Sequence, residues 1–445
     1  MKKSLVFIIT VVFLSATYLF LWRFYPLNRG MFYGFALLYL LEIYLFWIYH
    51  KNFFTGSRLK GIILTTLFWL PMLMIVLLAV SSLVKPYDEW QPALKTYYAG
   101  FIFTGYTAKI LPMLLVLFSD FIFGVRKLFE KSVRSPEHST EGKTLKRSEF
   151  LKKIGLIGGG LVFGTFTLGM FKWVYDFQIK RKSIRLKGLP QVFQGLKIVQ
   201  ISDLHLGSWV SKNELTEAVK IVNDLNPDLI FHTGDLVNYS TDEAFRFEDI
   251  LTALKSRYGI FSVLGNHDYG DYKRWKSKKE KAHNLDEMVA LHERLGWKLL
   301  RNTNHVLEMD GKKLAIIGVE NWGSLRRFQK FGDLHKAIQG VESIPVKLLL
   351  SHDPTHWQVK VSEFPIPVQV TFSGHTHGAQ FGIEVPGMRW SPSQYVYKYW
   401  SGLYEETHEK TGQKQFLYVN RGLGSIGYPG RVGMLPEITL IELHA

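Results

Sequence analysis

Five long stretches that are almost free of charged residues, all within the first 175 positions, constrain this chain more than any other feature. They cover residues 4–22, 31–49, 61–84, 97–119 and 154–171, and the third has 24 residues without a formal charge. A helix that crosses a bilayer needs about 20 apolar residues, within a range of about 17–25. Amphipathic periodicity is missing and the linkers are short, so we predict five membrane-spanning helices rather than the buried helices of a soluble domain.

Basic residues are distributed unevenly between the linkers, and their distribution indicates an orientation. Two lysines precede the first stretch, three basic residues follow the second, and nine basic residues against four acidic ones occupy 125–153. The linkers after the first and third stretches carry two basic residues each. We therefore predict a cytoplasmic N-terminus in the cell membrane and a C-terminal domain on the extracytoplasmic side. A basic cluster at 180–187 opposes this orientation, unless it contacts anionic head groups.

The run 146–152, just before the fifth stretch, is similar to a twin-arginine export signal. Ser148 stands where such a signal has its second arginine. The alternative interpretation is an ordinary cytoplasmic anchor sequence. Both interpretations place a C-terminal domain outside the cytoplasm.

Two charged residues, Glu42 and Lys109, lie inside predicted spans. Charges at that depth are costly and usually face a partner or a cavity. We predict an ion pair that fixes helix packing, and the alternative is a lipid or ion site between helices. The fifth stretch is rich in glycine, and Gly160 and Gly164 have the spacing that lets two helices approach closely.

The formal net charge of +16 would also suit a nucleic-acid-binding protein. Residues 1–153 contribute 19 basic and 8 acidic residues, whereas 154–445 contribute 35 and 30. The excess lies beside the hydrophobic stretches, so membrane topology explains it and we expect no nucleic-acid partner. The chain has no cysteine, which excludes a disulfide scaffold, a thiolate metal site and a cysteine nucleophile.

From about residue 195 the pattern changes to short β-rich runs that alternate with amphipathic helices. Runs typical of strands cover 196–202, 228–233, 259–264, 313–320, 347–350, 368–372, 414–419 and 438–443, and helical spacing covers 212–225 and 241–256. Asp203, Asp235 and Asn266 each follow a strand and are separated by 32 and 31 residues. One strand–helix–strand unit takes about 30 residues or more. These polar residues therefore share the carboxyl edge of a parallel sheet, where α/β folds place their sites.

Eight side chains that directly follow strands suit a site for two divalent metal ions. They are Asp203, His205, Asp235, Asn266, His267, His352, His375 and His377. Carboxylates can bridge two ions, imidazoles bind through one ring nitrogen, and an amide oxygen is a ligand without charge. Oxygen and nitrogen ligands without sulfur fit Mn, Fe, Zn, Co or Ni. Each residue alone has common structural explanations, and the prediction depends on their joint pattern.

The same residues form a series of motifs in a characteristic order. The motifs are Asp203-Leu204-His205, Gly234-Asp235, Gly265-Asn266-His267-Asp268, the single His352, and Gly374-His375-Thr376-His377. In this order they resemble the calcineurin-like metallophosphoesterase superfamily over about 195–444. The C-terminal Asn420-Arg421-Gly422-Leu423-Gly424 and Arg431 resemble its exported, membrane-anchored, YkuE-like branch. Ala379 departs from the pattern, because many relatives have glycine there.

The resemblance implies a two-sheet sandwich built on βαβαβ units and a role for each site residue. Asp203, His205 and His377 would bind one metal ion, Asn266, His352 and His375 the second, and Asp235 both. His267 would face the substrate phosphate and stabilise the transition state or protonate the leaving oxygen. Asp268 is expected to orient His267.

These observations predict five regions and one activity. The regions are a four-span part at 1–124, a basic cytoplasmic linker at 125–153, a fifth span at 154–175, a basic juxtamembrane segment at 176–194, and the phosphoesterase domain at 195–445. Two cations lower the pKa of a bridging water, whose hydroxide would attack a phosphate ester or pyrophosphate. Membrane tethering favours a lipid-linked or envelope substrate, and no protein partner is predicted. The alternatives are a non-catalytic binding module and a transport or sensing protein that works through its helices.

Overall fold

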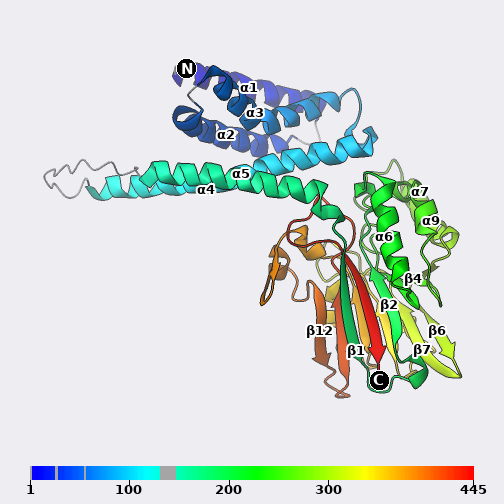
Figure 1. The fold of residues 1–445 in the computed structure, drawn as a ribbon. Coiled ribbons are helices and arrows are strands. Elements are labelled where there is room, and N and C mark those ends of the chain that lie inside the picture. The colour runs from blue at the N-terminus through cyan, green and yellow to red at the C-terminus, as the bar shows by residue number, and fades with distance from the viewer. Residues whose placement is uncertain (1–2, 26–28, 55–56, 131–146) are drawn as a thin grey trace. The chain divides into compact units, whose positions relative to one another are not determined.

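The computed structural model describes residues 3–25, 29–54, 57–130 and 147–445 of the chain (Figure 1). These residues form two compact units, Met1–Thr167 and Leu168–Ala445.

The first unit consists of long apolar helices. They are α1 (Lys3–Phe24), α2 (Met31–Phe53), α3 (Arg58–Ser81), α4 (Pro92–Glu130) and most of α5 (Arg147–Phe171). Within the described ranges, five helices are long and apolar enough to cross a membrane. The five predicted spans are thus confirmed, and the chain is a multi-pass membrane protein. The predicted linker at 125–153 begins inside α4 and ends inside α5, and its central part, 131–146, lies outside the described residues.

The two charged residues inside the spans form the predicted ion pair. The ammonium of Lys109 on α4 contacts the carboxylate of Glu42 on α2 and also donates to the carbonyl oxygen of Phe68, 2.5 Å away on α3. The hydroxyl of Tyr106 donates to the other oxygen of Glu42 at 3.1 Å. Pairing and hydrogen bonding offset the cost of placing these charges within apolar helices, and they join α2, α3 and α4.

The close approach of α4 and α5 uses a different glycine pair from the predicted one. Among the described residues outside the helix's own turn, no heavy atom lies within 4 Å of an added Cβ at Gly160 or Gly164. A Cβ at Gly155 would instead lie 3.2 Å from Cα of Pro112, and one at Gly159 would lie 2.9 Å from Cγ of the same proline. Within the described part of this chain, the predicted close approach at Gly160 and Gly164 is therefore not found, because an added Cβ at either glycine meets no neighbouring helix.

The second unit contains two six-stranded sheets. The first has the order β1 (Gln178–Arg185), β14 (Glu437–His444), β2 (Leu196–Ile201), β3 (Leu229–His232), β4 (Ile260–Ser262) and β5 (Lys298–Leu299). The second has the order β12 (Gly402–Thr407), β13 (Lys414–Val419), β9 (Val370–Ser373), β8 (Lys347–Leu350), β7 (Lys312–Gly318) and β6 (Thr303–Met309). Strands β2 to β5 are parallel to one another, as are β7, β8, β9 and β13. A small hairpin of β10 (Ile383–Val385) and β11 (Met388–Trp390) completes the strands.

The two sheets pack face to face, and short or amphipathic helices cover their outer faces. Phe231 of β3 and Phe372 of β9 meet edge to face in the core between the sheets, with ring centroids 4.9 Å apart. Helices α6 (Lys212–Asp224) and α9 (Lys278–Arg294) cover the first sheet (Figure 1). Helix α10 (Leu334–Ala337) packs on the second. This arrangement is the expected two-sheet α/β sandwich, and it brings the carboxyl ends of both parallel sets of strands to one edge.

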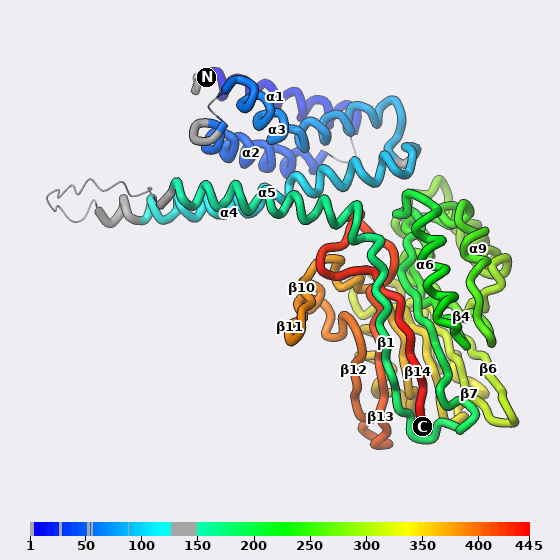
Figure 2. Tube along the Cα trace, viewed as in Figure 1, coloured from blue at the N-terminus to red at the C-terminus, as the bar shows by residue number. Residues whose placement is uncertain are grey.

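Two boundaries differ from the sequence prediction. The segment predicted as a basic juxtamembrane stretch, 176–194, contains β1, which pairs in parallel with β14 from Gln178 opposite Glu437 to Arg185 opposite His444. Figure 2 shows β1 and β14 side by side along their whole length. The sheet therefore begins before residue 195. The helix expected over 241–256 is two short helices, α7 (Asp242–Phe245) and α8 (Glu248–Leu251).

Candidate metal centre

Loops at the carboxyl ends of five parallel strands carry the predicted ligands. Strands β2, β3 and β4 lead to Asp203, Asp235 and Asn266, and β8 and β9 lead to the histidine loops. Five ligand candidates have left-handed backbone conformations, namely Asp203 (φ 50°), His205 (φ 44°), Asp235 (φ 57°), His375 (φ 73°) and His377 (φ 52°). This conformation is uncommon outside glycine, and such strain collects at functional sites.

Glycines inside the motifs let these loops pack against one another. A Cβ on Gly374 would overlap the side chains of Ser202 and Asp203. A Cβ on Gly265 would overlap the carboxylate of Asp235. The glycine that precedes each ligand pair therefore makes room for a carboxylate from another strand.

The first cluster comprises Asp203, His205 and His377, all of which are buried. Nε2 of His377 lies 3.2 Å from Oδ1 of Asp203 and 3.0 Å from Nε2 of His205. The three ligand atoms lie within 4.8 Å of one another. A single cation can therefore reach all three.

The second cluster comprises Asp235, His352 and His375, with Asn266 on the neighbouring loop. Nε2 of His352 lies 3.2 Å from Oδ2 of Asp235 and 3.1 Å from Nδ1 of His375. The same Oδ2 of Asp235 lies 3.6 Å from Nε2 of His205 in the first cluster. The Asp235 carboxylate therefore stands between the two clusters.

The donor atoms fit divalent metal ions. Oδ1 of Asn266 is buried and has no hydrogen-bond partner within the described part of the chain. Its Nδ2 donates to the hydroxyl of Tyr272 at 2.9 Å, which fixes the orientation of the amide. A buried acceptor without a partner is costly, and a cation would satisfy it. The set of carboxylate, amide and imidazole donors is the one expected for Mn, Fe, Zn, Co or Ni.

Burial and neighbouring charges hold most of these groups in the protonation states that metal binding requires. Burial raises the pKa of the Asp203 carboxyl, but His377 and then His352 together more than offset burial, so the pKa lies below its usual value. Burial lowers the pKa values of His205, His375 and His377. Carboxylates are then ionised and imidazoles neutral, as ligands must be.

His352 is the exception among the imidazoles. Burial lowers its pKa, but the carboxylate of Asp235 outweighs burial and raises the pKa to about 10. A cation bound to Asp235 would compete with that proton. Nδ1 of His352 contacts the carbonyl oxygen of Thr233 at 2.7 Å, which leaves Nε2 directed toward Asp235.

His267 lies beside both the first cluster and Asp235. Its ring meets the His205 ring edge to face, with centroids 4.9 Å apart, and its backbone N–H donates to Oδ1 of Asp235 at 2.8 Å. Nδ1 of His267 lies 2.7 Å from the carbonyl oxygen of Asn238. A carbonyl oxygen only accepts hydrogen bonds, so Nδ1 carries the proton and Nε2 is the exchangeable nitrogen.

Asp268 has a different environment from the predicted one. Its carboxylate accepts backbone N–H groups from Asp235, Leu236, Val237 and Gly265 at 2.8–3.3 Å. Burial, followed by the charge of Asp235, raises its pKa to about 7. Asp268 thus joins the loops after β3 and β4, and the partner of the His267 ring is Asn238 instead.

Two further residues, to which the sequence motifs assign no role, contact the candidate ligands. The hydroxyl of Tyr397 lies 3.0 Å from Nε2 of His375. The guanidinium of the fully buried Arg431 lies 3.3 Å from Nδ1 of His377 and donates to the carbonyl oxygens of Arg421 and Gly422 at 2.9 and 3.1 Å. Arg431 belongs to the C-terminal motif seen in the sequence, but Tyr397 lies in an aromatic-rich segment without a motif.

Comparisons with known proteins cover both units. The family described as "Calcineurin-like phosphoesterase" matches residues 196–379, and "Probable Calcineurin-like phosphoesterase, transmembrane domain" matches 28–173. The Bacillus subtilis protein named "Uncharacterized metallophosphoesterase YkuE" is 30% identical over 68% of this chain and 99% of its own length. A Danio rerio "Transmembrane protein with metallophosphoesterase domain" is 27% identical over 74% of this chain and 70% of its own. The Chlamydia trachomatis "UDP-2,3-diacylglucosamine pyrophosphatase LpxG" is 28% identical over 57% of this chain and 87% of its own.

Proposed function

Because this chain belongs to the calcineurin-like phosphoesterase family and is a membrane-bound metallophosphoesterase, we propose that it uses two divalent metal ions to hydrolyse a phosphate ester or pyrophosphate of a lipid-linked substrate. The position of Asp235 carries the two-metal part of the proposal. Its Oδ2 lies 3.2 Å from Nε2 of His352 and 3.6 Å from Nε2 of His205. One carboxylate within reach of two imidazole clusters is the arrangement that two neighbouring cations require.

We assign the ligands by these contacts. Asp203, His205 and His377 would hold the first ion, Asn266, His352 and His375 the second, and Asp235 both. The bound ions would supply a hydroxide nucleophile near neutral pH and neutralise charge on the phosphoryl group. Asn266 contributes an oxygen without another negative charge, which suits a site that must accept an anionic ester.

His267 is the proton donor in this proposal. Its Nδ1–H is held by the carbonyl oxygen of Asn238, so only Nε2 exchanges a proton with a substrate. A protonated Nε2 would stabilise charge on the phosphoryl oxygens and transfer its proton to the leaving oxygen. Arg431 and Tyr397 contact ligand imidazoles and position them.

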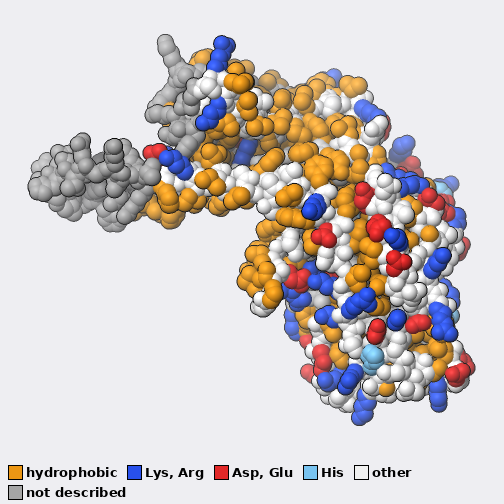
Figure 3. Space-filling view, viewed as in Figure 1, with side chains coloured by type: hydrophobic (Ala, Val, Ile, Leu, Met, Phe, Trp, Pro, Cys, Tyr) orange, Lys and Arg blue, Asp and Glu red, His pale blue; other side chains and the backbone are white. Residues whose placement is uncertain are grey.

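The hairpin β10–β11 supports a lipid-linked substrate. It follows the segment η7 (His377–Gln380), which begins with a proposed metal ligand, and it carries Ile383, Val385 and Met388 with exposed fractions of 45%, 50% and 50%. Figure 3 shows apolar side chains gathered over this hairpin. Exposed apolar patches of this kind are typical of lipid or partner contacts. One relative is named for hydrolysis of UDP-2,3-diacylglucosamine, a substrate with acyl chains that such a patch would contact.

Hydrolysis by the purified full-length protein in detergent tests the proposal. Mn²⁺, Fe²⁺, Zn²⁺, Co²⁺ and Ni²⁺ would be added in turn, with nucleotide-sugar lipids, phospholipids and bis(p-nitrophenyl) phosphate as substrates. We expect turnover that requires a divalent ion and is abolished by Asp235→Asn. Asp286→Asn, on the exposed face of α9, is the matched control and should retain full activity. Metal-independent turnover, or full activity of Asp235→Asn, would contradict the two-metal mechanism.

A further inference from the structure

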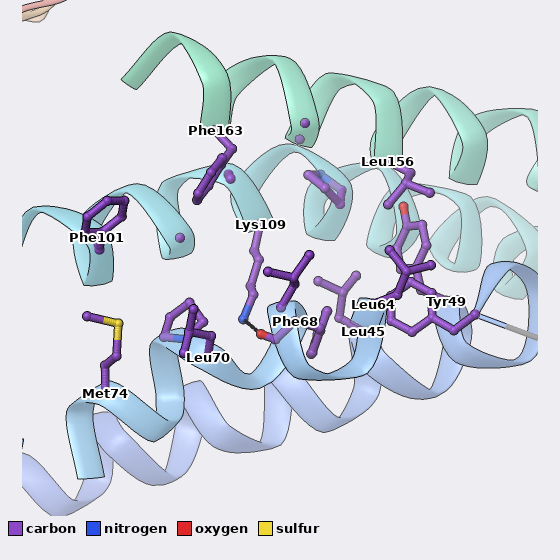
Figure 4. A pocket seen from close by; sticks show the side chains of 18 residues that line it. Leu45, Tyr49, Leu64, Phe68, Leu70, Met74, Phe101, Lys109, Leu156 and Phe163 are labelled. Carbon is purple, nitrogen blue, oxygen red and sulfur yellow. Dashed lines mark hydrogen bonds between the residues drawn. The ribbon is translucent and has the colours of Figure 1, made fainter. Parts of the chain in front are cut away.

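The membrane unit contains an elongated apolar cavity between α2, α3, α4 and α5. Its volume is about 570 Å³, within the range of about 300–1,000 Å³ that is usual for ligand pockets. The walls include Leu45, Leu64, Phe68, Met74, Phe101 and Phe163 (Figure 4). Along α3 the lining extends from Leu64 to Met74, which corresponds to about 15 Å at about 1.5 Å per residue.

Small residues on α5 and α4 explain why the cavity exists. Gly159 packs against α4, where an added Cβ would lie 2.7 Å from the carbonyl oxygen of Ala108. The next residue, Gly160, also lines the cavity, but no heavy atom lies within 4 Å of an added Cβ there. Helix α5 is therefore in contact with α4 at Gly159 and leaves open space at the adjacent Gly160. Small residues bring membrane helices together, and here one of them leaves a gap instead.

The charges at the cavity wall are neutralised. Lys109 is the charged residue among the described lining residues, and its ammonium contacts the Glu42 carboxylate and the carbonyl oxygen of Phe68. Figure 4 shows the Lys109 side chain extending from α4 toward Phe68. The side chain of Glu42 is 1% exposed. The wall thus has no unpaired charge to bind an ion or a charged head group. The remaining described lining side chains are apolar except Tyr49, whose hydroxyl donates to the carbonyl oxygen of Lys152 at 3.1 Å.

We propose that this cavity binds one hydrocarbon chain of a membrane lipid. The helices span a bilayer, so hydrocarbon chains are the molecules available at their sides. An apolar cavity left empty loses dispersion contacts along its whole lining, and a chain that lies parallel to α3 matches the extent of about 15 Å over which that helix lines the cavity. The bound chain would contact α5 on the Gly160 side and hold it against α3. This site is separate from the metal centre, and its occupancy does not depend on catalysis.

Two substitutions of glycines on α5 test whether the cavity binds a lipid chain. Gly160→Leu would place a large side chain at the cavity wall, because Gly160 lines the cavity and an added Cβ meets no heavy atom of the described residues within 4 Å. Gly164→Leu is the matched control on the next turn, where an added Cβ also meets nothing within 4 Å but the residue does not line the cavity. The full-length protein in nanodiscs would be irradiated with a phosphatidylglycerol that carries a diazirine at the middle of one acyl chain, and the labelled residues mapped by mass spectrometry.

We expect labelling of Phe101 in the wild type and in Gly164→Leu. In Gly160→Leu the labelling should fall roughly tenfold, because overfilling costs about 1–3 kcal/mol. Ile63, which is exposed and outside the lining, reports ordinary contact with bilayer lipid and should be labelled in every variant. Loss of Ile63 labelling would reveal a misfolded variant, and Met74→Trp would then fill the cavity from α3. Equal labelling of Phe101 in the wild type and a folded, filled variant would overturn the proposal, as would labelling confined to Ile63.

Discussion

The carbonyl oxygen of Asn238 lies 2.7 Å from Nδ1 of His267 and thereby fixes which nitrogen of the ring carries the proton. The ring also stacks on Tyr272, with centroids 4.2 Å apart. These two contacts hold the imidazole in one orientation beside Asp235. In the proposed mechanism, a proton donor held in this way would act without rearranging during the reaction.

Replacement of His267 should reduce turnover without removing metal. We expect His267→Asn to lower kcat by about 10²–10⁴-fold, the usual contribution of a positioned acid or base. Metal content measured by inductively coupled plasma mass spectrometry should be unchanged, because seven other residues supply the ligands. His283→Asn, at an exposed position of α9, is the control. His267 also lies within reach of a cation shared with His205 and Asp235, so loss of metal would identify it as a ligand instead.

Replacement of Asp268 should affect folding and metal binding together. Asp268→Asn turns one carboxylate oxygen into a donor that faces backbone N–H groups of the β3 and β4 loops. Each buried donor left without a partner costs about 1–3 kcal/mol, so we expect a lower unfolding temperature and weaker metal affinity. A residue that only orients His267 would instead lower kcat with unchanged stability. Thermal unfolding with and without added Mn²⁺ distinguishes the two.

The sequence predicted which candidate ligands come together more completely than it predicted their surroundings, for a physical reason. Asp203, Asp235 and Asn266 follow parallel strands, so local pattern and βα spacing are enough to bring them to one edge. The role of Asp268 depends on which backbone N–H groups reach its carboxylate. The contact of Tyr397 with His375 depends on the path of the loop after the β10–β11 hairpin. Neither is a property of local sequence, because both depend on tertiary packing.

In the membrane helices, too, composition predicts the elements, whereas packing determines which residues are in contact. Length and lack of charge predict five spans, and the cost of a buried charge predicts the pairing of Glu42 with Lys109. Gly160 and Gly164 have the same four-residue spacing as Gly155 and Gly159, so both pairs could allow close helix contact. The rotation of α5 about its own axis selects the second pair, and a periodic pattern of glycines does not specify that rotation.

The buried pair His232 and His292 should make the phosphoesterase domain sensitive to acid. Ser262 Oγ lies 2.8 Å from Nδ1 of His232 and 3.1 Å from Nε2 of His292. Burial lowers the pKa of His292 from 6.5 to about 4. The unfolded chain therefore binds the proton more tightly, so stability is complete above pH 6.5 and falls as the pH decreases toward 4.

Comparison of wild type with His292→Gln measures this contribution. At about 1.4 kcal/mol for each pKa unit, the wild type should lose up to about 3 kcal/mol more than the variant between pH 6.5 and pH 4. Chemical unfolding of the full-length protein in detergent at several pH values gives both curves. Parallel curves for the two proteins would show that His292 already takes up its proton in the folded state.

The absence of cysteine allows a direct test of the proposed orientation. Lys60 lies at the start of α3 on the predicted cytoplasmic side, and Lys410 is exposed in the phosphoesterase domain. A membrane-impermeant maleimide should label Lys410→Cys in intact spheroplasts and Lys60→Cys only after permeabilisation. The unsubstituted chain has no thiol to label and is the background control. The reverse labelling pattern would place the catalytic domain in the cytoplasm.

Substitution of an exposed apolar residue in the hairpin should affect hydrolysis of lipid-linked substrates but not of soluble ones. Val385→Ser removes apolar surface from the hairpin that follows the proposed metal-ligand segment and changes no ligand. KM for a diacylated nucleotide-sugar lipid should therefore rise. The kcat/KM for bis(p-nitrophenyl) phosphate, which has no acyl chain, should be unchanged. Loss of one half-exposed valine contact corresponds to about 1–1.5 kcal/mol, or roughly a five- to tenfold rise. Val359→Ser is the matched control, because Val359 is 45% exposed and lies in the segment Trp357–Val361, outside the hairpin. Equal effects on both substrates, or equal effects of the two variants, would show that the hairpin has no role in holding the hydrocarbon part of a substrate.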